Sequence, residues 1–186
     1  MIGPDFPEVL RAAVAGDEAA FGRLWYDLQP RLLRYFMVVS PAVADDLASE
    51  TWLGVVRGLD RFQGNETAFR AWVFTIARHE ALDWRRRGAR RVTELPVTGF
   101  VDQAAPDDPA VTALEGFSTR AALALVAMLP PDQAEAVTLR VVAGLDVERV
   151  AEIMGKRPGT VRVLTHRGLR RLAERLGADT RVRGVV

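Results

Sequence analysis

The 186-residue sequence contains no cysteine, two histidines and a single lysine. Without cysteine the chain can form no disulfide bond, no CxxC redox pair and no zinc site with thiolate ligands. His79 and His166 supply the only imidazole groups, and neither has a neighbouring His or Cys in the sequence. We therefore expect no metal site, no cofactor and no redox chemistry.

Long hydrophobic runs are also missing. The longest, from Ala121 to Leu129, is far shorter than the roughly 20 residues that a membrane-spanning helix needs. The first residues, MIGPDFPEVL, lack the basic region and apolar core of a signal peptide. With 49% hydrophobic and 26% charged residues, the composition is that of an ordinary globular protein. We expect a soluble cytoplasmic protein with one medium domain or two small ones.

No segment alternates convincingly between apolar and polar residues, as a half-buried strand would. Apolar residues instead recur at helical spacing, which predicts an all-α fold. We expect a first helical domain over residues 1–91 and a second over 112–177, with a C-terminal tail at 178–186. Residues 92–111 lose the periodicity and collect three prolines and several carboxylates, which predicts a flexible acidic linker.

The second domain shows the pattern of a helix-turn-helix. Helices are expected near 112–128, 131–142, 146–154 and 158–176. Asp146 is placed to cap the third helix, Gly155 permits a left-handed exit from it, and Pro158 suits the first turn of the fourth. The expected core stripe of the fourth helix consists of Val161, Leu164, Leu169, Leu172 and Leu176.

Charge is strongly segregated although the net charge is only +1. Residues 78–91 carry +4 and 156–175 carry +6, whereas 1–77 carry −3 and 92–115 carry −5. Two basic clusters in an otherwise acidic chain indicate two places that meet a polyanion, although a solvated basic helix face remains an alternative. Nearly all the basic residues are arginines, which favour bidentate contacts with phosphate or guanine.

Four sequence blocks together resemble a known family. In the first domain they are DDLASETWLGVVRGLDRFQG (Asp45 to Gly64) and FRAWVFTIARHEALDWRRR (Phe69 to Arg87). In the second they are LPPDQAEAVTLRVVAGLDVERVAEIMG (Leu129 to Gly155) and GTVRVLTHRGLRRL (Gly159 to Leu172). In this order the blocks resemble the extracytoplasmic-function sigma factors of bacterial RNA polymerase. The resemblance implies a protein without enzymatic activity that directs promoter recognition, DNA melting and transcription initiation in a stress or envelope response.

The resemblance also implies partners and sites. RNA polymerase core is the first partner, and its docking helix would include Asp45, Asp46, Leu47, Glu50, Thr51 and Leu53. Exposed carboxylates beside leucines suit a basic, amphipathic partner. The alternative is a solvated acidic face with Trp52 in the core. An anti-sigma factor is a further candidate partner by family analogy, and it would clamp the two domains together.

Promoter DNA is the second implied partner, at two elements. The downstream-element residues would be Gln63, Asn65, Thr67, Arg78, His79, Asp83, Trp84, Arg85 and Arg86. Residues 63–67 would capture a flipped base unless they form a plain interhelical loop, and Trp84 would either stack on a base or pack in the core. The upstream-element residues would be Arg157, Thr160, Arg162, Thr165, His166, Arg167 and Arg170, on the second helix of the helix-turn-helix.

Several positions depart from the family pattern. His79 stands where Asn is common, Ser49 replaces a common Gln, Arg149 a common Glu, and 163–165 read Val-Leu-Thr. Two other function classes also stay open from the residues alone. A stand-alone helix-turn-helix regulator would need symmetric half-sites. A DNA recombinase or nuclease would need a nucleophile or a metal-binding carboxylate cluster.

Overall fold

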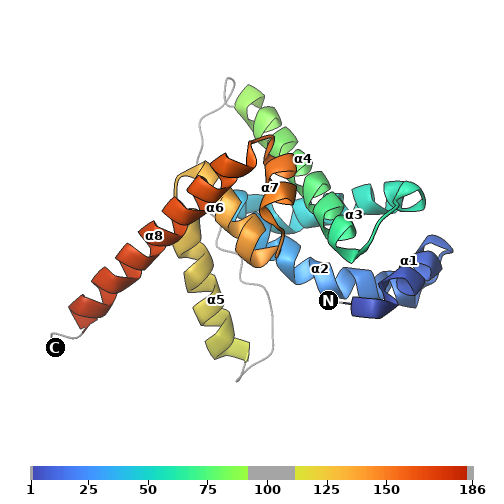
Figure 1. Cartoon of the computed structure of the whole chain (residues 1–186), viewed down its shortest axis with the longest axis horizontal. Helices are drawn as coiled ribbons and strands as arrows, with labels where there is room; N and C mark the ends of the chain where they lie inside the picture. The colour runs from blue at the N-terminus through green and yellow to red at the C-terminus, as the bar shows by residue number, and fades with distance from the viewer. Residues whose placement is uncertain (1, 92–111, 184–186) are drawn as a thin grey trace.

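The computed structural model describes residues 2–91 and 112–183, and every regular element in these ranges is helical (Figure 1). The all-α prediction is therefore confirmed. The predicted linker at 92–111 lies outside the described residues. Within the described ranges, no helix combines the length and the apolar character needed to cross a membrane.

The first domain is built around a long central helix, α2. Its elements are η1 (Gly3–Asp5), α1 (Phe6–Val14), α2 (Glu18–Val39), η2 (Pro41–Val43), α3 (Ala44–Gly58), η3 (Leu59–Arg61) and α4 (Glu66–Arg91). The Asp17 carboxylate caps α2 by accepting the Ala20 N–H at 2.9 Å. Tyr35 and Phe36 from α2 and Phe74 from α4 are fully buried, so the core of this domain lies between α2, α3 and α4.

The second domain consists of α5 (Thr112–Ala127), α6 (Pro131–Val137), the π-helical turn η4 (Thr138–Val142), α7 (Val147–Met154) and α8 (Pro158–Arg183). The predicted local signals between α7 and α8 are confirmed. The Asp146 carboxylate accepts the Arg149 N–H at 2.7 Å, Gly155 has φ 62°, and α8 begins at Pro158. α7 and α8 therefore form the predicted helix-turn-helix.

The predicted stripe of α8 is partly wrong. Val161 is fully buried, but Leu169 and Leu176 are 44% and 52% exposed. The face that packs on α6 includes Gly168, where an added Cβ would lie 2.7 Å from Val137 Cγ2. Leu169 is the next residue along α8, so its side chain lies off the face that packs on α6. Farther along, α8 projects beyond the other helices of its domain (Figure 1), so Leu176 meets less of the core.

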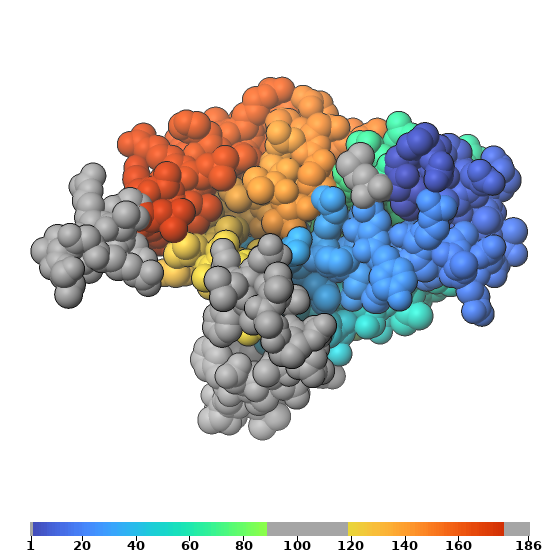
Figure 2. All heavy atoms as spheres, turned by 90° about the horizontal axis from the view of Figure 1, so that it is seen from below, coloured from blue at the N-terminus to red at the C-terminus, as the bar shows by residue number. Residues whose placement is uncertain are grey.

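The two domains share one apolar core. Buried Leu139, Leu145 and Val150 of the second domain belong to the same cluster as Tyr35 and Phe74 of the first. Helix α2 contacts α5, α6 and η4, and α7 lies against α4. Figure 2 shows the second-domain atoms, in orange, packed directly on the blue atoms of the first domain. The described chain is thus a single packed body in which α4 and α6–α7 face each other.

Candidate nucleic-acid interface

Helix α3 presents an acidic outer face and a buried inner face. Asp45, Asp46 and Glu50 are exposed, and Leu53 is 54% exposed beside them. Leu47 and Thr51, which the resemblance placed on the docking surface, lie in the core instead, at 3% and 0% exposure. They sit on the side of α3 that packs against α2 and α4, so they support the helix from beneath and cannot contact a partner directly.

Trp52 is also part of the inner face of α3. It is 7% exposed, and its indole N–H donates to Gln29 Oε1 at 2.7 Å. The sequence analysis gave two alternatives for this segment, a docking surface or a solvated acidic face with Trp52 in the core. The structure is compatible with both, because the carboxylates lie on the outer side of α3 and Trp52 lies on its inner side.

Gln63 and Asn65 lie in the loop before α4 and Thr67 in its first turn, and all three are exposed. The Asn65 side chain has a structural task, since its Oδ1 accepts the Ala68 N–H at 2.9 Å and caps α4. Gly64 adopts φ 154°, and a Cβ there would lie 2.9 Å from the Ala68 Cβ. The turn is therefore closely packed, while Gln63 and Thr67 remain exposed.

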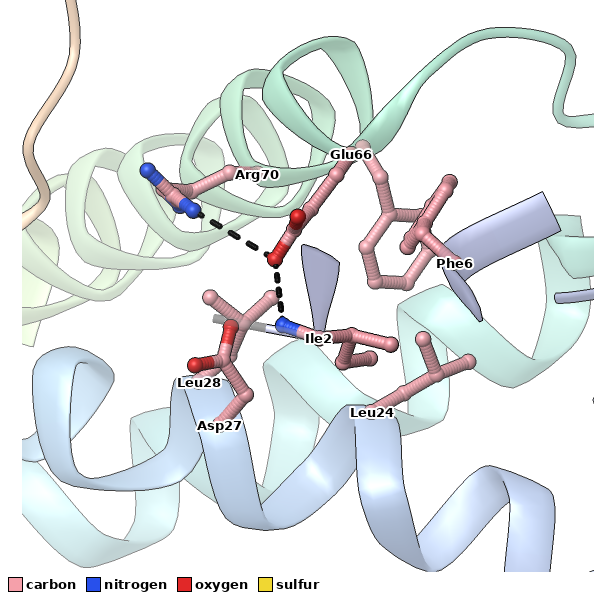
Figure 3. A pocket seen from close by; sticks show the side chains of 8 residues that line it. Ile2, Phe6, Leu24, Asp27, Leu28, Glu66 and Arg70 are labelled. Atoms are coloured by element: carbon pink, nitrogen blue, oxygen red, sulfur yellow. Dashed lines mark hydrogen bonds and ion pairs between the residues drawn. The ribbon is translucent and has the colours of Figure 1, made fainter. Parts of the chain in front are cut away.

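A buried ion pair that the sequence analysis missed anchors this loop (Figure 3). Glu66, the first residue of α4, accepts the N–H groups of Ile2 at 2.8 Å and Gly3 at 3.1 Å. Its carboxylate also lies 3.7 Å from Arg70, too long for a hydrogen bond, and the Arg70 side chain is only 6% exposed. The N-terminal segment thus holds the start of α4. The Glu66–Arg70 pair has the i,i+4 spacing of a helical ion pair, which the sequence displays. No local signal reveals the two N-terminal hydrogen bonds to Glu66, because their partners are more than 60 residues apart.

The C-terminal half of α4 carries the first basic cluster. His79, Asp83, Trp84, Arg85 and Arg86 are exposed on it. Trp84 is 38% exposed, so of the two alternatives for this residue the structure does not support packing in the core. Arg86 pairs with Asp83 at 3.2 Å, and Arg85 donates to the Val39 carbonyl at the end of α2. Most of this surface is open to a polyanion.

Arg78 is the exception in this cluster. Its Nε donates to Glu135 Oε1 of α6 at 2.9 Å, and the two side chains are only 19% and 14% exposed. The Tyr35 hydroxyl of α2 donates to the same Oε1 at 3.1 Å. Burial, and then the nearby Glu135 carboxylate, raise the pKa of Tyr35 well above its ordinary value. The hydroxyl therefore stays a donor, and one carboxylate of the second domain is held by two helices of the first.

The second basic cluster lies on α8. Arg157 directly before α8 is exposed, and so are Thr160, Arg162, His166, Arg167 and Arg170 on the helix, whereas Thr165 is half-buried. Arg162 pairs with Glu148 of α7 at 3.0 Å, and Arg170 pairs with Glu174 at 2.9 Å, with all four side chains more than half exposed. Exposed pairs of this kind contribute about 0–1 kcal/mol, so they yield readily to a phosphate.

Among residues 2–91 and 112–183, no three His, Asp or Glu side chains gather as a metal site would require. Asp45, Asp46 and Glu50 are exposed on α3 and do not form such a group. The chemistry that the exposed side chains offer is binding, with carboxylates on α3 and guanidinium groups on α4 and α8.

Comparison with known proteins identifies the family. The models for Sigma-70 region 2 and Sigma-70, region 4 match residues 26–91 and 119–172. The chain is 36% identical to the ECF RNA polymerase sigma factor BldN of Streptomyces coelicolor, over 94% of this chain and 67% of that protein. It is 32% identical to the ECF RNA polymerase sigma factor SigD of Mycobacterium tuberculosis, over 96% of this chain and 87% of that protein.

A solved structure agrees with this assignment. The sigma factor RpoE of Bartonella quintana, crystallised with the anti-sigma factor NepR, matches with a TM-score of 0.65 and 26% identity, over 86% of this chain and 98% of that one. Both halves of the sequence and the arrangement of its helices lead to one conclusion: the chain belongs to the extracytoplasmic-function (ECF) RNA polymerase sigma factors and is a promoter-recognition factor.

Proposed function

We propose that this sigma factor binds RNA polymerase core through the outer face of α3. The surface comprises Asp45, Asp46, Glu50 and Leu53, which are exposed on one helix whose inner face is locked in the core. Carboxylates around an exposed leucine suit a basic amphipathic element of the polymerase. The support comes from family membership together with the exposure of these four side chains.

The downstream promoter element would meet the loop before α4 and the exposed half of α4. Gln63 and Thr67 offer hydrogen bonds to a base outside the duplex, and Trp84 offers a stacking surface. Arg85 and Arg86 supply positive charge beside them. Each captured base offsets part of the few kcal/mol needed to unstack it, so this surface would hold the melted strand.

The upstream element would meet α8. As the second helix of the helix-turn-helix, it would enter a major groove, with Arg162 and His166 nearest base edges or adjacent phosphates and Arg167 and Arg170 on phosphates. Family membership favours this polymerase-dependent action over a stand-alone regulator. The protein would act in the cytoplasm, without catalysis of its own, in a stress or envelope response.

An anti-sigma factor is a further partner in this proposal. The similar structure of RpoE from Bartonella quintana is a complex with the anti-sigma factor NepR. A protein that bound both domains of this chain at once would hold α4 against α6–α7.

Run-off transcription with purified core polymerase on a genomic fragment library tests the proposal. The wild-type chain should direct initiation at a defined set of promoters. The double variant Asp46→Ala/Glu50→Ala should lose affinity for core polymerase and initiate correspondingly less, whereas Glu152→Ala, which removes an exposed carboxylate of the second domain, should not. Nanomolar binding of a promoter duplex by the free chain, unchanged by core polymerase, would contradict the proposal.

A further inference from the structure

One interdomain contact differs from every other ion pair described for the basic clusters. The pairs of Arg86, Arg162 and Arg170 are exposed and join residues of the same domain. Arg78 is instead paired with Glu135 across the domain boundary, in a site where both side chains are mostly shielded from water. An exposed pair exchanges its carboxylate for a phosphate in place, whereas Arg78 can meet a phosphate only after α6 has moved away.

Glu135 is held from two sides. Its Oε1 accepts the Arg78 Nε–H at 2.9 Å and the Tyr35 hydroxyl at 3.1 Å. Hydrogen bonds between charged partners are roughly twice as strong as neutral ones, and the shielding strengthens them further. Another hydrogen bond also joins the two domains: Arg31 of α2 donates to the Val142 carbonyl at the end of η4 at 3.2 Å.

A carboxylate that accepts a guanidinium N–H presents the same chemistry as a DNA phosphate oxygen, with negative charge and acceptor lone pairs. We propose that Glu135 is an intramolecular competitor of DNA for Arg78, so that the free chain keeps part of its downstream-element surface occupied by its own second domain. This inference rests on the proposed role of α4 in promoter binding. The new element is that the packing of the two domains against each other opposes DNA binding directly, through the Glu135 side chain.

The consequence for affinity follows from mass action. If only the open form exposes Arg78, the apparent dissociation constant for DNA equals the intrinsic constant divided by the open fraction. Weakening the Glu135 contact raises that fraction, so the free chain should bind DNA more tightly.

The test compares Glu135→Gln with the wild-type chain. The amide keeps the shape of the side chain and an oxygen acceptor for Tyr35, but it removes the charge that holds Arg78. Glu152→Gln is the matched control, because it removes the same charge from the same domain at an exposed pair with Arg149. The probe is a short single-stranded DNA oligonucleotide of mixed sequence, titrated at several salt concentrations.

Glu135→Gln should bind this oligonucleotide more tightly by a factor on the order of ten, the worth of about one charge-assisted contact. The log–log dependence of affinity on salt should also steepen by about 0.7, the value for one further phosphate contact to a single strand. Glu152→Gln should change neither quantity beyond its general charge effect, and adding Arg78→Ala to Glu135→Gln should cancel the gain.

The distance between domains supplies an independent measurement. Because the sequence has no cysteine, spin labels can be attached to Ala19→Cys and Ala173→Cys, two exposed sites in different domains, without competing thiols. Glu135→Gln should add a population with longer distances. If Glu135→Gln fails to fold, Tyr35→Phe, which removes one of the two bonds to Glu135, should give a smaller change in the same direction.

Unchanged distances and an unchanged salt slope in the folded variant would overturn the inference. Its failure is distinguishable from failure of the proposed function. If wild-type protein directs initiation with core polymerase while Glu135→Gln binds the oligonucleotide like wild type, only the inference is wrong. If no promoter responds to the wild-type holoenzyme, the proposed function itself is wrong.

Discussion

Replacing Gly168 with alanine tests the packing of the helix-turn-helix domain at its closest point. An added Cβ would lie 2.7 Å from Val137 Cγ2, 3.4 Å from Leu129 Cδ1 and 3.5 Å from Gln133 Cβ. These neighbours cannot move into solvent, because Val137 is 3% and Leu129 4% exposed. Overpacking of this kind costs about 1–3 kcal/mol. Alanine gains about 1 kcal/mol over glycine in a helix, so the net destabilisation should be about 1 kcal/mol.

Urea denaturation followed by circular dichroism measures this change as a lower midpoint at an unchanged m-value. Gly159→Ala is the control in the same helix, since nothing lies within 4 Å of the position that its Cβ would take. That variant should be as stable as wild type or slightly more stable. In a Val137→Ala background, which removes the clashing methyl group, Gly168→Ala should become neutral or stabilising, with a coupling of about 0.5–3 kcal/mol.

A Gly168→Ala protein that is more stable than wild type, with no coupling to Val137→Ala, would refute the reasoning. That result would mean that α6 and α8 lie farther apart than the distances above.

Three further predictions concern the first domain and the shared core. Because the folded-state pKa of Tyr35 is raised above 10.0, its contribution to stability is complete below about pH 10 and is lost as the pH rises toward the folded pKa. Tyr35→Phe should therefore lose less stability than wild type between about pH 9 and about pH 11 in urea titrations, and an equal loss would contradict this. Asn65→Ala should cost about 1 kcal/mol through the lost cap of α4, whereas Asn65→Asp should retain most of that stability at neutral pH. Leu139→Ala should cost about 2–5 kcal/mol, because Leu139 is fully buried; a change within 0.5 kcal/mol would exclude it from the core.

Features that depend on near neighbours in the chain could be predicted from the sequence. Asp146, Gly155 and Pro158 act within one or two turns of their own positions, so their residue types alone indicate a cap, a left-handed exit and a helix start. The helical spacing of apolar residues similarly predicts an all-α fold. Membership of the family rests on ordered blocks, which the sequence also displays.

The sequence could not reveal which side of each helix would be covered, or by what. Leu47 and Thr51 share α3 with exposed carboxylates, and only packing against α2 and α4 decides that they are buried. Leu169 fits an apolar stripe, but the close approach at Gly168 sets the contact face. Glu135 lies 100 residues from Tyr35 and 57 from Arg78, and no local periodicity connects residues so far apart.

The shared core has a consequence for protein engineering. Promoter specificity in a two-domain factor invites chimeras, in which the second half is exchanged for that of a relative. Here such an exchange would set foreign side chains against Arg31 and Arg78, whose present partners are the Val142 carbonyl and Glu135. A working hybrid would therefore have to transplant the facing residues of α2 and α4 together with the new half, so the unit of exchange is larger than either domain.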